Sequence, residues 1–296
     1  EGRDDLDRVF AYDKGPSGIS PRGVRGLAVV CRTLARERFD LTVDLQGLLR
    51  SAVMAAATRA PLRVGLADAR EGARWFYTHR VDAPRARVHA VDRVSRVVEA
   101  LGGSPSAPEF SLPIGPEDLA WADRALAAVP TPRLVLNVGA RWPSKRWAID
   151  RFAEVAHRAV EEFGAGLVAV GAAEDRPMVD ALRRALGRAP ILDLCGATSL
   201  LRLAALARLS DVYLSNDTGP LHLAAAAGAA VVGIYTRTDP NLTGPYGPRA
   251  VAVSSHPRGA SSYKTRDRPE PRDEIGPDRV WAAVRPRLAR AVGSAA

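Results

Sequence analysis

The chain has few of the residues that build covalent or metal scaffolds. Only two of its 296 residues are cysteines, Cys31 and Cys195, and no CxxC spacing brings thiols together. This excludes a disulfide framework or a cysteine-based zinc site and indicates a reducing compartment, the cytoplasm. The five histidines lack a ligand spacing such as HExxH, so we expect no bound metal. No apolar run approaches the length of a membrane span, which predicts a soluble protein.

Lysine is scarce as well, although the chain is basic. Arginine and lysine together number 42 against 33 acidic residues, a formal net charge of +9, but only Lys14, Lys145 and Lys264 are lysines. A basic surface attracts nucleic acid, anionic lipid or an acidic substrate. The arginines are spread along the chain, few aromatic residues lie among them, and no nucleic-acid-binding motif is present, so we expect no nucleic-acid partner.

Strands and helices alternate along most of the chain. In the second half, apolar runs at 133–138, 167–170, 191–194, 212–215 and 229–235 predict strands separated by helices. Repeated units of this length are typical of a parallel sheet that is covered on both faces. The first half predicts strands at 39–44 and 62–65 among helices at 24–38, 48–58 and 89–101, and the last helix is expected at 277–292. The fold class is therefore α/β.

The segment NDTGPLH at 216–222 is the most informative stretch of the sequence. It joins a predicted strand to a predicted helix, and Pro220 suits the first helical turn, where its missing N–H costs nothing. The unpaired N–H groups of a helix start favour an anion. His222 falls in the first turn and faces that position. Asp217-Thr218-Gly219 also spells the triplet of aspartic proteases, but those need two carboxylates, and the sequence holds no second copy.

Three loops are expected at the carboxyl edge of the second sheet, where α/β proteins bind ligands. They cover residues 139–147, 171–174 and 216–222 and together supply cations, carboxylates, hydroxyls and glycines. This inventory suits a diphosphate joined to polyhydroxylated groups. Lys145 lies between two tryptophans; it is either a surface lysine or the cation that neutralises a leaving phosphate. His222 has a comparable alternative, as a helix-start residue that bonds its own turn.

Several motifs together resemble family 9 glycosyltransferases, the lipopolysaccharide heptosyltransferases. The segment NVGARWPSKRW at 137–147 is similar to that family's NPGA…KRWP stretch, and residues 216–226 match D(S/T)GPxHLAAA. The segment TDPNLTGPYG at 238–247 resembles TDPxxxGPYG. In the first half, VDLQGLLRSA at 43–52 resembles DxQGLxKSA, and HAVDR at 89–93 resembles HAVER of the heptosyltransferase I branch. The motifs occur in the family's order over nearly the whole chain.

The resemblance implies a GT-B fold, in which two Rossmann-like domains face each other across a cleft. We expect an acceptor-binding domain at 1–129, incomplete at its N-terminus, and a nucleotide-sugar-binding domain at 130–276. The helix at 277–296 is expected to cross back to the first domain. The implied reaction is inverting, metal-independent transfer of heptose from ADP-heptose to a Kdo sugar of the lipopolysaccharide inner core. It needs no cofactor besides the donor.

The resemblance also implies roles for individual residues. Lys145 would neutralise the phosphates. Donor contacts are implied for Asp217, Thr218, Gly219, His222, Ala140, Arg141 and Glu174, and acceptor contacts for Arg50, Arg93, Arg63 and Arg74. The anionic, lipid-linked acceptor implies a cytoplasmic enzyme in peripheral contact with the inner face of the inner membrane.

One feature of the family is not found. Its members open with an apolar strand and a Gly-Asp turn that carries the proposed general base, and this sequence contains neither. Relative to the family, we therefore expect about one βαβ unit of the first domain, ~30 residues or more, to be missing from this sequence. Two other functions stay open: a GT-B enzyme with another nucleotide-sugar donor, and a non-catalytic protein that binds a nucleotide-sugar or an acidic glycan.

Overall fold

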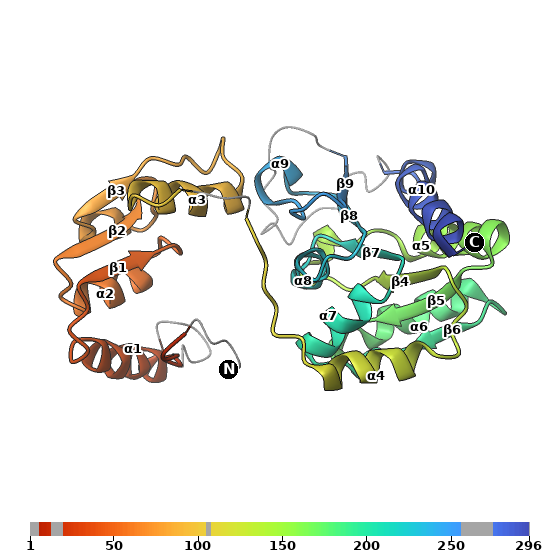
Figure 1. Ribbon diagram of the computed structural model, residues 1–296, viewed down its shortest axis with the longest axis horizontal. Helices are drawn as coiled ribbons and strands as arrows, with labels where there is room; N and C mark the ends of the chain where they lie inside the picture. Colours follow the sequence, from red (N-terminus) through yellow and green to blue (C-terminus); the bar gives the residue numbers. More distant parts are fainter. Residues whose placement is uncertain (1–5, 13–19, 105–107, 256–274, 296) are drawn as a thin grey trace. The chain divides into compact units, whose positions relative to one another are not determined.

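The structure consists of two compact units, residues 1–109 and 110–296. The computed structural model describes residues 6–12, 20–104, 108–255 and 275–295 (Figure 1). The division falls in the proline-spaced segment, before the boundary expected after residue 129. The reason is that α4 (Pro116–Leu126) packs against α7 (Leu200–Arg208) and so belongs to the second unit.

The first unit is built on a small parallel sheet with the strand order β1-β2-β3. The sequence predicts β1 and β2 but not β3, which is only three residues long and largely polar. The elements of this unit are α1 (Pro21–Leu34), β1 (Leu41–Asp44), α2 (Leu49–Ala57), β2 (Leu62–Leu66), the 3-10 helix η1 (Ala73–Phe76), β3 (His79–Val81) and α3 (Ala90–Ala100).

The second unit contains a six-stranded sheet with the order β6-β5-β4-β7-β8-β9, and every neighbouring pair is parallel. The chain builds outward from β4 in one direction and then returns to build outward from β7 in the other. This is the doubly wound, Rossmann-like order. The strands are β4 (Arg133–Asn137), β5 (Gly166–Val170), β6 (Ile191–Asp193), β7 (Val212–Asn216), β8 (Val231–Tyr235) and β9 (Ala250–Ser254).

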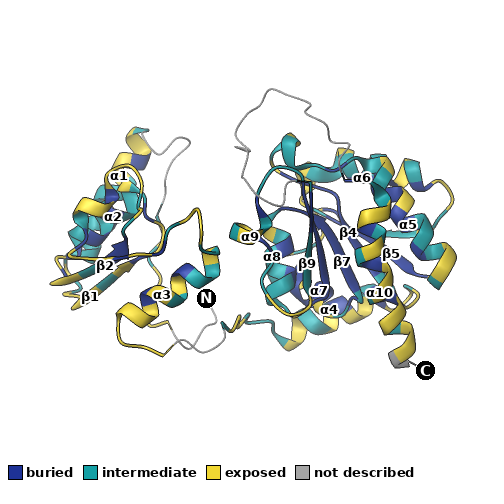
Figure 2. Ribbon diagram, turned by 90° about the horizontal axis from the view of Figure 1, so that it is seen from above, coloured by how far each residue is buried: buried dark blue, intermediate teal, exposed yellow. Residues whose placement is uncertain are grey.

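Helices cover both faces of the six-stranded sheet. Leu134 and Leu136 of β4 face a core that includes residues of α5, α6 and α10, whereas Val135 faces a core with α4, α7 and α8. Figure 2 shows the buried strands of this unit between helices that are exposed only on their outer sides. The remaining elements are η2 (Pro143–Lys145), α5 (Ile149–Phe163), η3 (Ala173–Asp175), α6 (Arg176–Leu186), α8 (Gly219–Ala226), α9 (Pro240–Thr243) and α10 (Pro277–Ala295).

The α/β fold class expected from the sequence, with parallel sheets, is confirmed. The strand β9, which the sequence analysis did not predict, extends the sheet beyond β8. Helix α10 packs against α5 of its own unit (Figure 1). Among the described residues, no helix has both the length and the apolar character needed to cross a membrane.

Candidate functional site

The candidate site lies at the carboxyl ends of β4 and β7. These two strands are neighbours in the sheet, and the chain leaves them toward opposite sides. In doubly wound sheets this reversal opens a crevice in which ligands bind. The loop after β4 carries η2 with Lys145, and the turn after β7 carries Asp217 and leads into α8.

The turn from β7 into α8 leaves the start of the helix accessible to a ligand. Thr218 is the N-cap residue in an extended conformation, but its hydroxyl does not cap the helix and lies 3.3 Å from the Ser215 hydroxyl instead. Pro220 stands in the first turn, as expected. The helix start thus keeps the anion-favouring geometry expected from the sequence.

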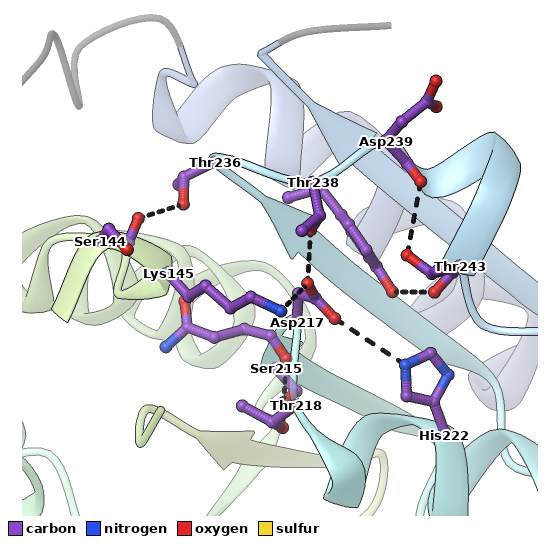
Figure 3. A network of polar contacts seen from close by, with 12 residues as sticks. Ser144, Lys145, Ser215, Asp217, Thr218, His222, Thr236, Thr238, Asp239 and Thr243 are labelled. Carbon is purple, nitrogen blue, oxygen red and sulfur yellow. Dashed lines mark hydrogen bonds and ion pairs between the residues drawn. The ribbon is translucent and has the colours of Figure 1, made fainter. Parts of the chain in front are cut away.

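Asp217 is the centre of a polar network (Figure 3). Its Oδ2 atom accepts hydrogen bonds from Lys145 Nζ, at 2.5 Å, and from the hydroxyl of Thr238. Its Oδ1 atom lies 3.8 Å from Nε2 of His222. The structure therefore brings three predicted site residues together, Lys145, Asp217 and His222, although Lys145 and Asp217 are 72 positions apart.

The network holds its charges in a largely buried place. Asp217 is 7% exposed, and the Lys145 side chain is 16% exposed. Burial raises the pKa of the Asp217 carboxyl, but its contacts with His222, Lys145 and Thr238 outweigh burial, so the pKa lies below its usual range. Asp217 is therefore an anion at neutral pH and forms an ion pair with Lys145. Burial and the Asp217 charge raise the pKa of the neighbouring Tyr235, which stays neutral.

Asn216 fixes the loop that carries Lys145. Its side chain is fully buried; Oδ1 accepts a hydrogen bond from the Trp147 backbone N–H at 2.9 Å, and Nδ2 donates to the Val138 carbonyl at 2.8 Å. The Thr236 hydroxyl donates to the Ser144 carbonyl at 2.8 Å, which ties the same loop to the end of β8 (Figure 3). Lys145 is thus held in a defined position.

Thr238, Asn216 and Asp175 have no individual role predicted from the sequence. Asp175, at the end of η3, accepts a hydrogen bond from the Ala172 N–H at 3.0 Å. Its carboxylate lies so close to Gly139 that a Cβ atom there would collide with it. Each of the three residues stands in or beside a segment singled out from the sequence, but only the packing of neighbouring strands shows its role.

The other predicted donor residues occupy the same sheet edge. The Ala140 carbonyl accepts a hydrogen bond from Arg146 Nε at 2.9 Å. The Arg141 guanidinium lies 5.8 Å from the centre of the Trp142 ring. Glu174 is exposed in η3, after β5. Gly219 begins α8. Their contacts with a donor stay predictions.

The four arginines predicted to meet an acceptor all lie in the first unit, in separate surroundings. Arg93 is 6% exposed and pairs with Asp68 at 2.5 Å, and Arg63 donates to the Phe76 and Ala60 carbonyls at 3.0 and 2.7 Å. The Arg50 guanidinium lies 5.6 Å from the Tyr12 ring, and that of Arg74 lies 4.8 Å from the Trp75 ring. Arg63 and Arg93 thus stabilise this unit, and the acceptor role of all four stays a prediction.

Within the part of the chain that the structure describes, no group of three or more histidine, cysteine, aspartate or glutamate residues could hold a metal ion. Lys145 and the N-terminus of α8 both favour an anion at the crevice. The arrangement suits a phosphate group held between them.

Comparisons with known proteins find relatives in sequence and in fold. Glycosyltransferase family 9 (heptosyltransferase) matches residues 28–272. The lipopolysaccharide core heptosyltransferase OpsX of Haemophilus influenzae is 26% identical over 241 residues, which cover 80% of this chain and 67% of that protein. Lipopolysaccharide heptosyltransferase 1 of Pseudomonas aeruginosa is 29% identical over 222 residues, or 73% and 60% of the two chains. The matched part of this chain therefore spans 67% of the length of the first relative and 60% of the length of the second.

Two solved structures have the same fold. A glycosyl transferase family 9 protein from Veillonella parvula superimposes with a TM-score of 0.75 and 25% identity, over 90% of this chain and 79% of that one. The Escherichia coli heptosyltransferase WaaC with ADP gives a TM-score of 0.66 at 21% identity, over 92% of this chain and 80% of that one. The second likeness concerns the fold alone.

Proposed function

Because the chain belongs to glycosyltransferase family 9, we propose that it transfers a heptose to the lipopolysaccharide inner core. The donor is a nucleotide-sugar, ADP-heptose, and the acceptor is a Kdo sugar. The names of the relatives support the heptose and the lipopolysaccharide. E. coli WaaC has been solved with ADP and with ADP-2-deoxy-2-fluoro heptose, which supports the nucleotide.

The observation that carries this proposal is the network of Lys145 and Asp217 beside the start of α8. Transfer breaks the bond between the sugar carbon and the diphosphate, and negative charge develops on the departing phosphate oxygen. A cation and helix N–H groups directed at that oxygen lower the barrier. Lys145 supplies the cation, and its ion pair with Asp217 holds it in place. The mechanism assigns no step to a metal or a cofactor.

The acceptor side of the proposal places the anionic, lipid-linked glycan on the first unit. Arg50, Arg63, Arg74 and Arg93 are the proposed contacts. Attack from the face opposite the diphosphate inverts the anomeric centre. We assign no residue of this sequence as the base that takes the proton of the acceptor hydroxyl. The enzyme would work at the cytoplasmic face of the inner membrane, in peripheral contact with it.

Titration calorimetry with Lys145→Ala tests the donor site. ADP should bind the wild-type protein more tightly than UDP or GDP, and Lys145→Ala should weaken ADP about 10- to 100-fold, the loss of one charge-assisted contact of about 1.5–3 kcal/mol. The matched control is Arg184→Ala, which removes a positive charge from an exposed position of α6. Equal ADP affinity in wild type and Lys145→Ala would contradict the assignment. Preference for UDP or GDP would instead indicate another donor.

A further inference from the structure

An exposed tryptophan on the first unit has no part in the network described above. Trp75 lies on η1 and is 67% exposed. Leaving so large an apolar side chain in water forgoes the free energy of burying it, and exposed apolar groups set among polar ones often mark interaction sites. Trp75 is therefore a candidate interaction site of the first unit.

The turn that carries Trp75 is firmly anchored. Ala73, the first residue of η1, and Tyr77, which follows the helical turn, are 0% and 5% exposed. The Tyr77 ring covers the backbone of Gly65 so closely that a Cβ atom there would collide with it. The Glu71 carboxylate accepts a hydrogen bond from the Leu49 N–H at 3.2 Å. The indole is thus presented to solvent on a fixed support.

Two guanidinium groups flank the indole. Those of Arg74 and Arg80 lie 4.8 and 5.0 Å from the ring centre, and Arg80 Nε donates to the Arg74 carbonyl at 3.0 Å. Neither arginine forms an ion pair with any of the described residues. Between positions 70 and 80 the chain has three arginines against one acidic residue, Glu71. The turn combines one large apolar group with a local excess of positive charge.

We propose that Trp75, Arg74 and Arg80 form a docking surface for an anionic lipid bilayer. Tryptophan favours the boundary between headgroups and acyl chains, and guanidinium groups bind phosphate oxygens with two donors each. One indole and two guanidiniums provide far less than the roughly 800 Å² per partner of a stable protein interface. A bilayer requires no such area, because an inserted aromatic ring and a few basic residues act as independent anchors.

The proposal names the surface through which the membrane contact proposed above is made, and it rests on that proposal for the choice of a bilayer. The test is vesicle binding without donor or acceptor. A negative result would therefore leave the transfer reaction and the Lys145 assignment unaffected, and a failed transfer assay would leave vesicle binding measurable.

Co-sedimentation with vesicles of phosphatidylcholine, with and without phosphatidylglycerol, gives the partition coefficients. We expect binding that requires phosphatidylglycerol. The pair Arg74→Ala/Arg80→Ala should reduce it about 25-fold, at about fivefold for each basic residue. Trp75→Ala should reduce it about tenfold or more. The matched control is Arg184→Ala/Arg188→Ala, which removes the same charge from exposed positions of the second unit and should change binding by less than about twofold.

A second measurement follows the indole itself. Lipids brominated on their acyl chains should quench part of the tryptophan fluorescence of the wild type, and Trp75→Phe should abolish that part. Equal binding to both vesicle types, or unchanged quenching in Trp75→Phe, would overturn the proposal. Binding that survives Trp75→Ala but needs both arginines would also overturn it, because it would indicate electrostatic binding to headgroup phosphates without the tryptophan contact that the proposal requires.

Discussion

Replacing Asn216 by alanine tests whether the site depends on the tether between β7 and the Lys145 loop. Asn216 is fully buried and makes two hydrogen bonds, from the Trp147 N–H and to the Val138 carbonyl. Alanine removes both bonds at once. The N–H and the carbonyl then remain in a dry interior with no partner, and the lost side-chain volume leaves a small void.

The expected loss of stability follows from these two orphaned groups. Each buried polar group without a partner costs about 1–3 kcal/mol, so the free energy of unfolding should fall by about 2–6 kcal/mol. The loop would keep its bond between Thr236 and Ser144, so it would loosen without detaching. Since Lys145 is then no longer held in one position, ADP affinity should fall about tenfold, equivalent to about 1.4 kcal/mol.

Urea unfolding, followed by tryptophan fluorescence, measures the first quantity, and titration calorimetry with ADP measures the second. Asn137→Ala is the matched control: Asn137 is 2% exposed, and its Nδ2 donates to the Tyr213 hydroxyl at 3.2 Å, but it does not hold the Lys145 loop. The control should lose about 1–3 kcal/mol of stability and keep its ADP affinity. A loss below about 1 kcal/mol in Asn216→Ala, with ADP affinity unchanged, would refute the reasoning.

Two further predictions concern the same sheet edge. Gly139→Ala places a Cβ atom against the Asp175 carboxylate and should displace that carboxylate, so the free energy of unfolding in urea should fall by about 1–3 kcal/mol. The control Gly276→Ala has open space around its Cβ position and should be nearly neutral. Equal losses of stability in the two variants would count against the close approach of Gly139 and Asp175. The lowered pKa of Asp217 contributes stability that is present above the unfolded-state pKa of about 3.9 and is lost as the pH falls below it toward the folded-state pKa. Asp217→Asn should therefore lose less stability than the wild type between about pH 5 and 3, and parallel pH profiles of the urea midpoint would exclude this contribution.

The sequence predicted the elements whose signals are local. The turn between β7 and α8 was found because a strand, a turn with glycine and proline, and a helix follow one another directly. The meeting of Lys145 and Asp217 was inferred in a different way, from the rule that the carboxyl ends of parallel strands share one edge. That inference needed no knowledge of which strands are neighbours. The resemblance to glycosyltransferase family 9, and its GT-B fold class, are confirmed.

The sequence could not predict contacts that depend on strand order and loop packing. Thr238 reaches Asp217 because β8 lies next to β7, and no local pattern specifies that neighbour. Asp175 is found only from its close approach to Gly139. The burial of Arg93 depends on Asp68, 25 positions away, so a positive charge that suggested ligand binding also has a structural partner.

A lysine at position 145 suits the geometry of the network and the proposed reaction. The chain contains 42 basic residues, of which only Lys14, Lys145 and Lys264 are lysines, so an arginine would be the expected residue at a random position. An arginine beside a carboxylate tends to pair through two donors in one plane. An ammonium group directs its three donors tetrahedrally, so it can bond Asp217 Oδ2 and also face an anion at the start of α8. A compact cation that serves a carboxylate and a phosphate in different directions is what the proposed reaction requires of Lys145.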